Sequence, residues 1–531
     1  MVINLIRNKF FFLISIFIIL SIFFAPIYIV ANEYAFISAA LNFFNQNDNY
    51  IGHTESIRTG WLKFFFFYFY NFFGYEIGWK ISRILSLIFF SYAFYHFSLS
   101  FRFSNISILI SILIFSLAKQ SFFGTEYILG TFEFKVIAYI LVILSLSFLE
   151  RRSFLKSIIL ISLAIYSHFL VGYFWFGVIC IYYYLNKRNF KEIFKYFIKV
   201  FLITFPLLLI LIYENYYINL DPSINYNNIF LGRLSGLTNP YNQDWSLKSD
   251  WILGYVIILI NIFLLFFLKK NVKNIINNNF LLLIILLNFY LIFLTFLLYF
   301  DRSFFIAKFI PFRPESLTLL FSLFIITELS LVLYFKKTLK KKVVILFILT
   351  ILLSSPAIFN YKYNLIRASQ IITLRIHYVF TNINKPLKYF LEIDDLKLLN
   401  WVRNKTSEDD IIIFEDGFNY SKRREKDLIL FSKSDRLLVS RLLSSSWEVI
   451  SGRPAYVNAD AIGGNFKELI KWSKRLKEKR EIYNGNCEVI KNTSIKYAIS
   501  FTENKRVNLS KCLKKKSYQI GKYNIFKINN K

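Results

Sequence analysis

Long apolar runs alternate with short basic loops along the first 360 residues of this 531-residue chain. The first run covers 10–30, and most of the others are about 17–22 residues long, which matches the thickness of a bilayer's hydrocarbon core. An α-helix satisfies its backbone hydrogen bonds within its own segment, as lipid requires. Charged residues make up only 18% of the chain, fewer than a soluble protein of this size carries. The sequence therefore predicts a polytopic α-helical membrane protein.

The net charge of +31 would suggest a nucleic-acid partner if the chain were soluble. Much of it lies in the short loops at 151–152, 187–188, 269–270 and 336–342. No zinc-finger, RNP or helix-turn-helix pattern accompanies these loops, so we expect no nucleic-acid partner. Cytoplasmic loops of membrane proteins are enriched in Lys and Arg, which places the four loops inside.

The expected spans follow from the apolar runs. They lie at about 10–30, 81–100, 105–122, 134–149, 154–168, 170–186, 194–213, 250–268, 279–300, 314–335 and 343–360. With the basic loops inside, the N-terminus is cytoplasmic and everything after about residue 360 is outside. We therefore expect about eleven spans in the cytoplasmic (inner) membrane.

The aromatic segment Trp61–Phe73 would give the wrong number of crossings if it spanned the membrane. It is short, and Lys63 and Asn71 interrupt it. We therefore predict a helix lying on the outer membrane surface, within an outer loop at about 31–80.

Composition changes near residue 391, after which no long apolar run occurs. The patterns predict a helix at 394–404, a buried strand at 410–414, a basic amphipathic helix at 466–479, a strand at 496–501 and a pair of strands at 518–528. Residues 391–531 are thus expected to form an α/β soluble domain outside the membrane, joined to the membrane domain 1–360 by a connector at 361–390.

Two of the three cysteines, Cys487 and Cys512, flank the predicted strand at 496–501 in this outer domain. Oxidising surroundings permit a disulfide there. Sequence alone shows no partner geometry, so a disulfide and two free thiols both remain open. Cys180 lies in a span, where we expect a buried apolar residue.

Glu33 follows the first apolar run at its outer end. A carboxylate at a membrane-embedded helix end is costly to desolvate, so it generally has a task or a partner. The alternative is an acid that complements the dipole of a helix's first turn, or an interfacial anchor. Position alone does not decide between them.

Beyond Glu33, the order of residues resembles the first outer loop of the GT-C membrane glycosyltransferases. His53, the aromatic run, Gly74 and the Arg83-Ile84-Leu85-Ser86 segment follow in the order of that superfamily, where an "R-x-x-S" opens the second span. The overall plan is also similar, with many spans and a C-terminal domain outside. The resemblance implies a GT-C-like transmembrane domain over 1–360.

Further motifs resemble an uncharacterised bacterial branch of GT-C-like proteins. They are Gly130–Lys135, Ser167–Gly172, Pro311–Arg313, and Ser451–Val457 with Glu468–Trp472 and Arg475. The chain departs from the pattern because Asn32-Glu33 stands where many members have two acidic residues, and no Pro follows the His. The resemblance implies no definite cofactor, and a divalent metal stays open.

The resemblance implies transfer of a sugar from a polyprenyl-phosphate donor to an envelope acceptor. One carboxylate takes the acceptor proton, and cations stabilise the departing phosphate. Glu33 is the expected base, with Glu55 as its substitute. The expected substrate-binding residues are His53, Arg58, Glu133, Lys135, His168 and Arg313.

Several of these residues also have structural interpretations. Arg58 and Lys135 could anchor spans by snorkelling, and Glu133 could pair with Lys135. His168 could cap a helix, and Arg313 could order its loop or bind lipid head groups. Rival functions are a glycolipid transporter or flippase and a non-catalytic envelope scaffold. Charges gathered at outer span ends, without an internal repeat, favour an enzyme over a transporter.

Overall fold

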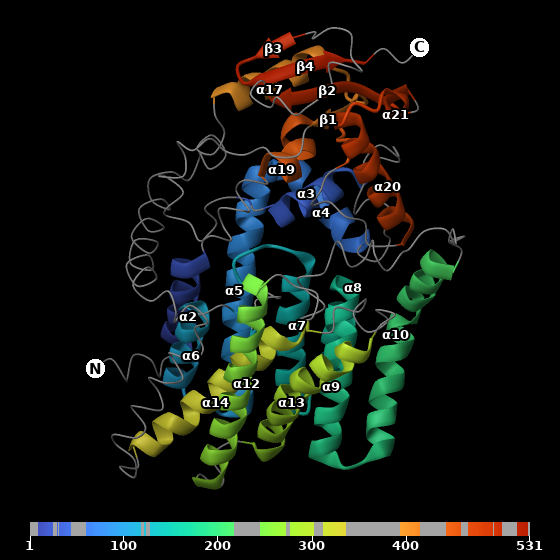
Figure 1. Cartoon of the computed structure of the whole chain (residues 1–531). Coiled ribbons are helices and arrows are strands. Elements are labelled where there is room, and N and C mark those ends of the chain that lie inside the picture. The colour runs from blue at the N-terminus through green and yellow to red at the C-terminus, as the bar shows by residue number, and fades with distance from the viewer. Residues whose placement is uncertain are drawn as a thin grey trace. The chain divides into compact units, whose positions relative to one another are not determined.

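The structure of this chain is a computed structural model (Figure 1). It describes residues 9–24, 29, 31–43, 60–117, 120, 122–123, 128–216, 245–271, 277–301, 312–335, 393–414, 442–457, 466–491, 493–501 and 518–528. The predicted span at 343–360 and the connector at 361–390 lie outside the described residues.

The chain divides into two compact units. The first, here called the bundle unit, comprises Met1–Ala25, Ser82–Leu211 and Phe230–Ile376. The second, here called the sheet unit, comprises Pro26–Ile81, Ile212–Ile229 and His377–Lys531. The predicted outer loop at 31–80 thus belongs to the same unit as the C-terminal domain.

Every predicted span within the described residues coincides with a helix. These helices are α2 (Lys9–Phe24), α5 (Tyr75–Phe101), α6 (Asn105–Leu117), α7 (Phe134–Glu150), α8 (Phe154–Ser167), α9 (Phe169–Lys187), α10 (Phe190–Tyr216), α12 (Trp245–Asn271), α13 (Asn278–Phe300) and α14 (Glu315–Phe335). Among the described residues, 5 helices are long and apolar enough to cross a membrane: α5, α9, α10, α13 and α14. By the length and composition of these helices, the chain is a membrane protein.

Hydrogen bonds define the two ends of the bundle unit. Tyr182 in α9 donates to Glu150 at the end of α7, and Asn277, which caps the start of α13, donates to the same carboxylate at 3.0 Å. The last turns of α7 and α9 therefore meet the first turn of α13. We call this the arginine end, because Arg152 and Arg188 follow α7 and α9 there. At the other end, the Tyr139 hydroxyl of α7 donates to the Arg313 carbonyl, just before α14, at 2.8 Å. We call this the motif end.

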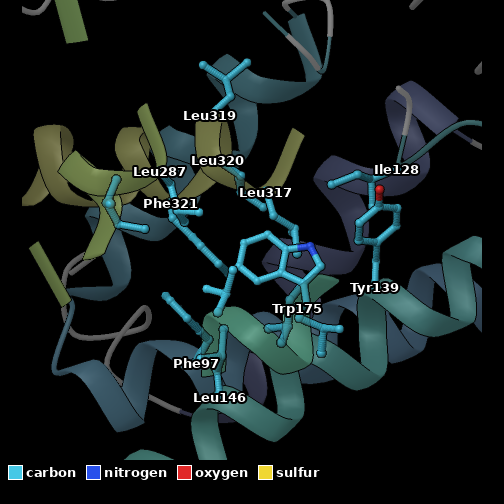
Figure 2. Packing of buried hydrophobic residues seen from close by; sticks show 14 of the residues in the cluster. Phe97, Ile128, Tyr139, Leu146, Trp175, Leu287, Leu317, Leu319, Leu320 and Phe321 are labelled. Atoms are coloured by element: carbon cyan, nitrogen blue, oxygen red, sulfur yellow. The ribbon is translucent and has the colours of Figure 1, made fainter. Parts of the chain in front are cut away.

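Aromatic packing forms the core of the bundle unit. Figure 2 shows the Trp175 indole in the middle of the cluster, with Leu317 beside it. The Phe321 ring lies 6.0 Å from Trp175 and stacks on Phe97 at 4.8 Å. Because lipid gives little hydrophobic driving force between helices, such close packing carries much of their association. In α14, 89% of the candidate span is buried, whereas in α10 only 22% of it is buried.

The sheet unit contains a sheet of order β1-β2-β4-β3 (Figure 1). Its strands are β1 (Ile411–Phe414), β2 (Ile495–Phe501), β3 (Tyr518–Ile520) and β4 (Tyr523–Lys527). Strand β1 pairs parallel to β2, and the other pairs are antiparallel. The helices of this unit are α3 (Ala31–Leu41), α4 (Gly60–Phe73), α17 (Ile393–Lys405), α19 (Leu442–Ser451), α20 (Phe466–Tyr483) and α21 (Cys487–Lys491). Each element predicted after residue 391 is present, whereas α19 and α21 were not predicted.

The β3–β4 hairpin is fixed to the first turn of α17. The backbone N–H of Lys522 donates to Asp394 at 3.1 Å, and the Lys522 ammonium lies 2.9 Å from Asp395. The Tyr523 hydroxyl also donates to Asp395. Charged groups that are buried with partners specify one geometry, so these bonds set the hairpin's position on the helix.

Candidate functional site

Glu33 lies in the first turn of α3, a helix of its own, because α2 ends at Phe24. Its side chain is 1% exposed. Helix α3 packs against α4 and α19, as Figure 1 also shows. We call these three helices the helix junction. Glu33 is therefore buried within a folded part of the sheet unit.

Three further polar or charged side chains are buried in the helix junction. Lys63 belongs to α4, Ser38 to α3 and Glu448 to α19. The Ser38 hydroxyl donates to the Glu448 carboxylate at 2.7 Å. Burying charged groups is unfavourable unless they are paired and hydrogen-bonded, so these side chains need partners within the junction.

Burial raises the pKa of Glu448 to about 7. The Ser38 hydroxyl, the Ala455 backbone N–H and the positive charge of Arg475 oppose this effect, since each favours the ionised carboxylate. Burial is therefore the dominant influence on the pKa of this carboxyl, and its hydrogen bonds and the nearby guanidinium offset only part of that influence.

Sequence reasoning missed Glu448. It precedes the Ser451–Val457 motif, and no motif includes it. The available signal was an isolated acid between Trp447 and Val449-Ile450, because an apolar helix that carries one carboxylate generally buries it with a partner.

Arg475, in a motif segment, is close enough to Glu448 for its charge to act on that carboxyl, and it also contacts Tyr456 of a second motif segment. Arg475 donates to the Tyr456 carbonyl at 3.1 Å, and its guanidinium lies 5.1 Å from the centre of the Tyr456 ring. The Tyr456 hydroxyl donates to Glu478, and burial together with this carboxylate raises the pKa of Tyr456. Tyr456 therefore stays protonated at neutral pH and acts as a hydrogen-bond donor.

The motif end of the bundle unit contains four predicted site residues. Glu133 directly precedes α7, and its carboxylate lies 3.1 Å from the Lys135 ammonium. The structure thus contains the pair that was one interpretation of these residues. Both side chains are largely buried, so their mutual attraction is less screened than on an open surface.

His168 has a helix-capping position. Its Nδ1 accepts the Val171 backbone N–H at 3.3 Å, at the start of α9. Gly172 in the same motif lets α8 and α9 approach, because a Cβ there would lie 2.3 Å from the Ile165 Cα. This motif therefore builds the corner between the two helices.

Arg313 lies in the turn before α14 and is half-buried. Its carbonyl accepts from Tyr139, which fixes the turn to α7. Two residues later, the fully buried Glu315 accepts the Phe123 backbone N–H at 3.0 Å. Arg313 thus lies at the same end of the bundle unit as Glu133 and Lys135.

Two other motif arginines stabilise backbone ends. Arg83 donates to the Phe24 carbonyl, where α2 ends, at 3.2 Å. Arg453 donates to the carbonyls of Arg403 and Thr406, at the end of α17, at 3.0 and 2.9 Å. Both arginines therefore have structural roles in which they satisfy the orphan carbonyls of helix ends.

The remaining predicted site residues are only partly described. His53, Glu55, Arg58 and Cys512 lie outside the described residues. Cys487 is disulfide-bonded and Cys180 is free. Because Cys512 lies outside the described residues, its pairing with Cys487 stays a prediction. Within the described parts of the chain, no group of three or more His, Cys, Asp or Glu could hold a metal ion.

Compared with protein-family models and with curated protein sequences, the chain matches none.

Proposed function

We propose that this chain is an integral membrane glycosyltransferase of the GT-C type. It transfers a sugar from a polyprenyl-phosphate donor to an acceptor of the cell envelope. In this proposal it lies in the cytoplasmic membrane with about eleven spans. Its N-terminus is cytoplasmic, and the α/β domain 391–531 lies outside.

The burial of Glu33 is the observation that carries the proposal. An interfacial anchor would present its carboxylate to lipid head groups or water, but this side chain is 1% exposed. The dipole of α3 would be complemented equally well by an exposed acid, since the effect operates within the first turn. A buried carboxylate generally has a task or a partner, and this proposal gives Glu33 a chemical task.

The proposed reaction needs one base and one group of cations. The acceptor oxygen forms a bond to the anomeric carbon while the bond from that carbon to the donor phosphate oxygen breaks. The acceptor proton goes to Glu33, and the polyprenyl phosphate leaves. Positive charge and N–H donors stabilise the developing charge of the phosphate, and in this proposal Lys135, His168 and Arg313 keep the substrate-binding role that was expected from the sequence.

A glycolipid transporter is the main rival, since transporters use charged residues within spans. Glu328 is such a residue, in α14. It accepts the Ser104 backbone N–H and hydroxyl, both at 2.7 Å, and so caps the start of α6. This carboxylate has a structural role, which favours the enzyme over the transporter.

Removal of the protein from cells tests the proposal. Mass spectrometry of lipid-linked sugars should then show an accumulated polyprenyl-phosphate sugar and loss of one envelope glycan. A transporter would instead leave the donor consumed and the product glycolipid on the wrong side of the membrane. Unchanged donor and glycan would contradict both.

A further inference from the structure

Three arginines at the arginine end of the bundle unit adopt left-handed backbone conformations. Arg102 follows α5 with φ 60°, Arg152 follows α7 with φ 61°, and Arg188 follows α9 with φ 50°. Among the described residues they are the only non-glycine residues with positive φ. A side chain in this conformation costs about 1 kcal/mol relative to glycine. All three are exposed, so no packing explains the choice of arginine.

These arginines lie at one end because their helices are tied together there. Arg151 donates to the Ser100 hydroxyl at 2.7 Å and to the His96 carbonyl at 3.1 Å, which joins the ends of α7 and α5. Tyr182 and Glu150 join the ends of α9 and α7. The turns that follow the three helices therefore gather on one surface.

Helix α10 continues this positive surface. Lys191, Lys195 and Lys199 are exposed and four residues apart, so they form one stripe along its first turns. Like charges at this spacing repel each other, which disfavours the stripe unless something neutralises it. The start of α10 lies beside the start of α8, because the Ser157 and Tyr196 hydroxyls are 2.8 Å apart.

The described chain places few acids near these cations. Glu150 is bonded to Tyr182 and Asn277 at the end of α7, and the exposed Glu192, which accepts from the Tyr183 hydroxyl at 3.0 Å, lies in the first turn of α10 and offsets one of the positive charges. None of the ion pairs among the described residues includes Arg152, Arg188 or the lysine stripe. The remaining positive charge is therefore available to an external anion.

The apolar side of α10 indicates which anion. Its large side chains are exposed from the lysine stripe onward, with Phe194 at 51%, Leu202 at 64% and Leu209 at 50%. In a candidate span that is only 22% buried, these side chains face lipid tails. A partner that meets both the lysines and the apolar side has an acyl chain and an anionic head.

We propose that Arg152, Arg188, Lys191 and Lys195, here called the basic rim, bind the phosphate of an anionic membrane phospholipid whose acyl chains lie along α10. The charge retained in strained positions, the exposed lysine stripe and the adjoining lipid-facing surface support the same ligand. Each cation near such a surface contributes about 1 kcal/mol of attraction. This site is independent of the proposed transferase activity.

Titration of the purified full chain with phosphatidylglycerol, followed by native mass spectrometry, tests the proposal. Lys191→Gln and Lys195→Gln should each weaken binding about fivefold relative to the wild type. Lys474→Gln and Lys477→Gln, which remove exposed charges of α20, are the matched controls and should leave binding unchanged.

Arg188→Gly gives a second, independent readout. It removes a charge and also relieves the left-handed strain, so phosphatidylglycerol binding should fall while the unfolding temperature in phosphatidylcholine alone does not. Equal phosphatidylglycerol binding by the wild type and all three rim variants would overturn the proposal. An equal loss in the α20 controls would do the same, since it would indicate non-specific attraction.

Discussion

Ser38 in α3 donates a 2.7 Å hydrogen bond to Glu448 in α19, although 410 residues separate them in the sequence. The bond connects the predicted outer loop to the C-terminal domain inside one unit. Because the pKa of Glu448 is about 7, the protonation of this carboxyl, and with it the hydrogen bond, should depend on pH near neutrality.

The contribution of Glu448 to the stability of the sheet unit should be larger at acidic than at alkaline pH. Because folding raises the pKa of Glu448 from its ordinary 4.5 to about 7, its contribution is fully present below about pH 4.5 and lost as pH rises through 7. The upper limit of this contribution to the free energy of unfolding is about 3 kcal/mol. Unfolding of the wild type and of Glu448→Gln across this range measures it. The Gln variant should lose this part of the slope, and the exposed-acid control Glu488→Gln should keep it.

Ser38→Ala should destabilise the same contact by about 1–3 kcal/mol, because it removes the donor from a buried carboxyl. The hydroxyl favours the ionised form, so its loss should raise the pKa of Glu448 further and move the pH midpoint upward. A double-mutant cycle with Glu448→Gln isolates the pair. Additive effects of the two substitutions would show that the bond is absent in solution.

Gly521→Ala should destabilise the hairpin by about 1–3 kcal/mol. Gly521 has φ +51°, and a Cβ would lie 2.1 Å from the Asp394 Cγ. Gly452 has φ +67°, and a Cβ added there would have nothing within 4 Å. Gly452→Ala is therefore the control, because it introduces backbone strain without a steric clash. Urea unfolding monitored in the sheet unit should rank Gly521→Ala as the more harmful change. The reverse order would contradict the contact with α17.

Gly172→Ala should lower the thermal stability of the bundle unit by about 1–3 kcal/mol, because its Cβ would meet the Ile165 backbone at 2.3 Å. Gly177 in the same helix has nothing within 4 Å. Gly177→Ala should therefore be neutral or slightly stabilising, since Ala favours helix. Thermal unfolding in detergent compares the two. Equal effects would mean that α8 and α9 do not approach closely at Gly172.

Local patterns predicted much of this fold because each of them acts within one element. Apolar runs placed the helices, and the alternation at 496–501 and 518–528 placed strands β2 to β4. Helix α2 ends at Phe24, before the predicted end of the first span at residue 30, and Pro26 was the local signal for this earlier end. Helix α3 lies in the segment that was predicted to be the start of the outer loop.

The site was harder to predict because its contacts join distant segments. Glu448 and Ser38 carry no shared motif, and only the tertiary fold brings them together. Conversely, His168 and Arg453 stood out in motifs, and the structure gives both helix-end roles. A motif selected for geometry looks the same in a sequence as one selected for chemistry.

The activity of the Glu33→Gln protein tests the central claim most directly. Purified wild type, Glu33→Gln and Glu328→Gln would be given a polyprenyl-phosphate sugar and an envelope acceptor fraction, with membrane insertion and unfolding temperature measured in parallel. We predict that Glu33→Gln inserts and folds but transfers about 10²–10⁴-fold more slowly. Glu328→Gln should lose stability while each folded molecule keeps its activity. Full transfer by folded Glu33→Gln would contradict the proposed base and move that role to Glu55.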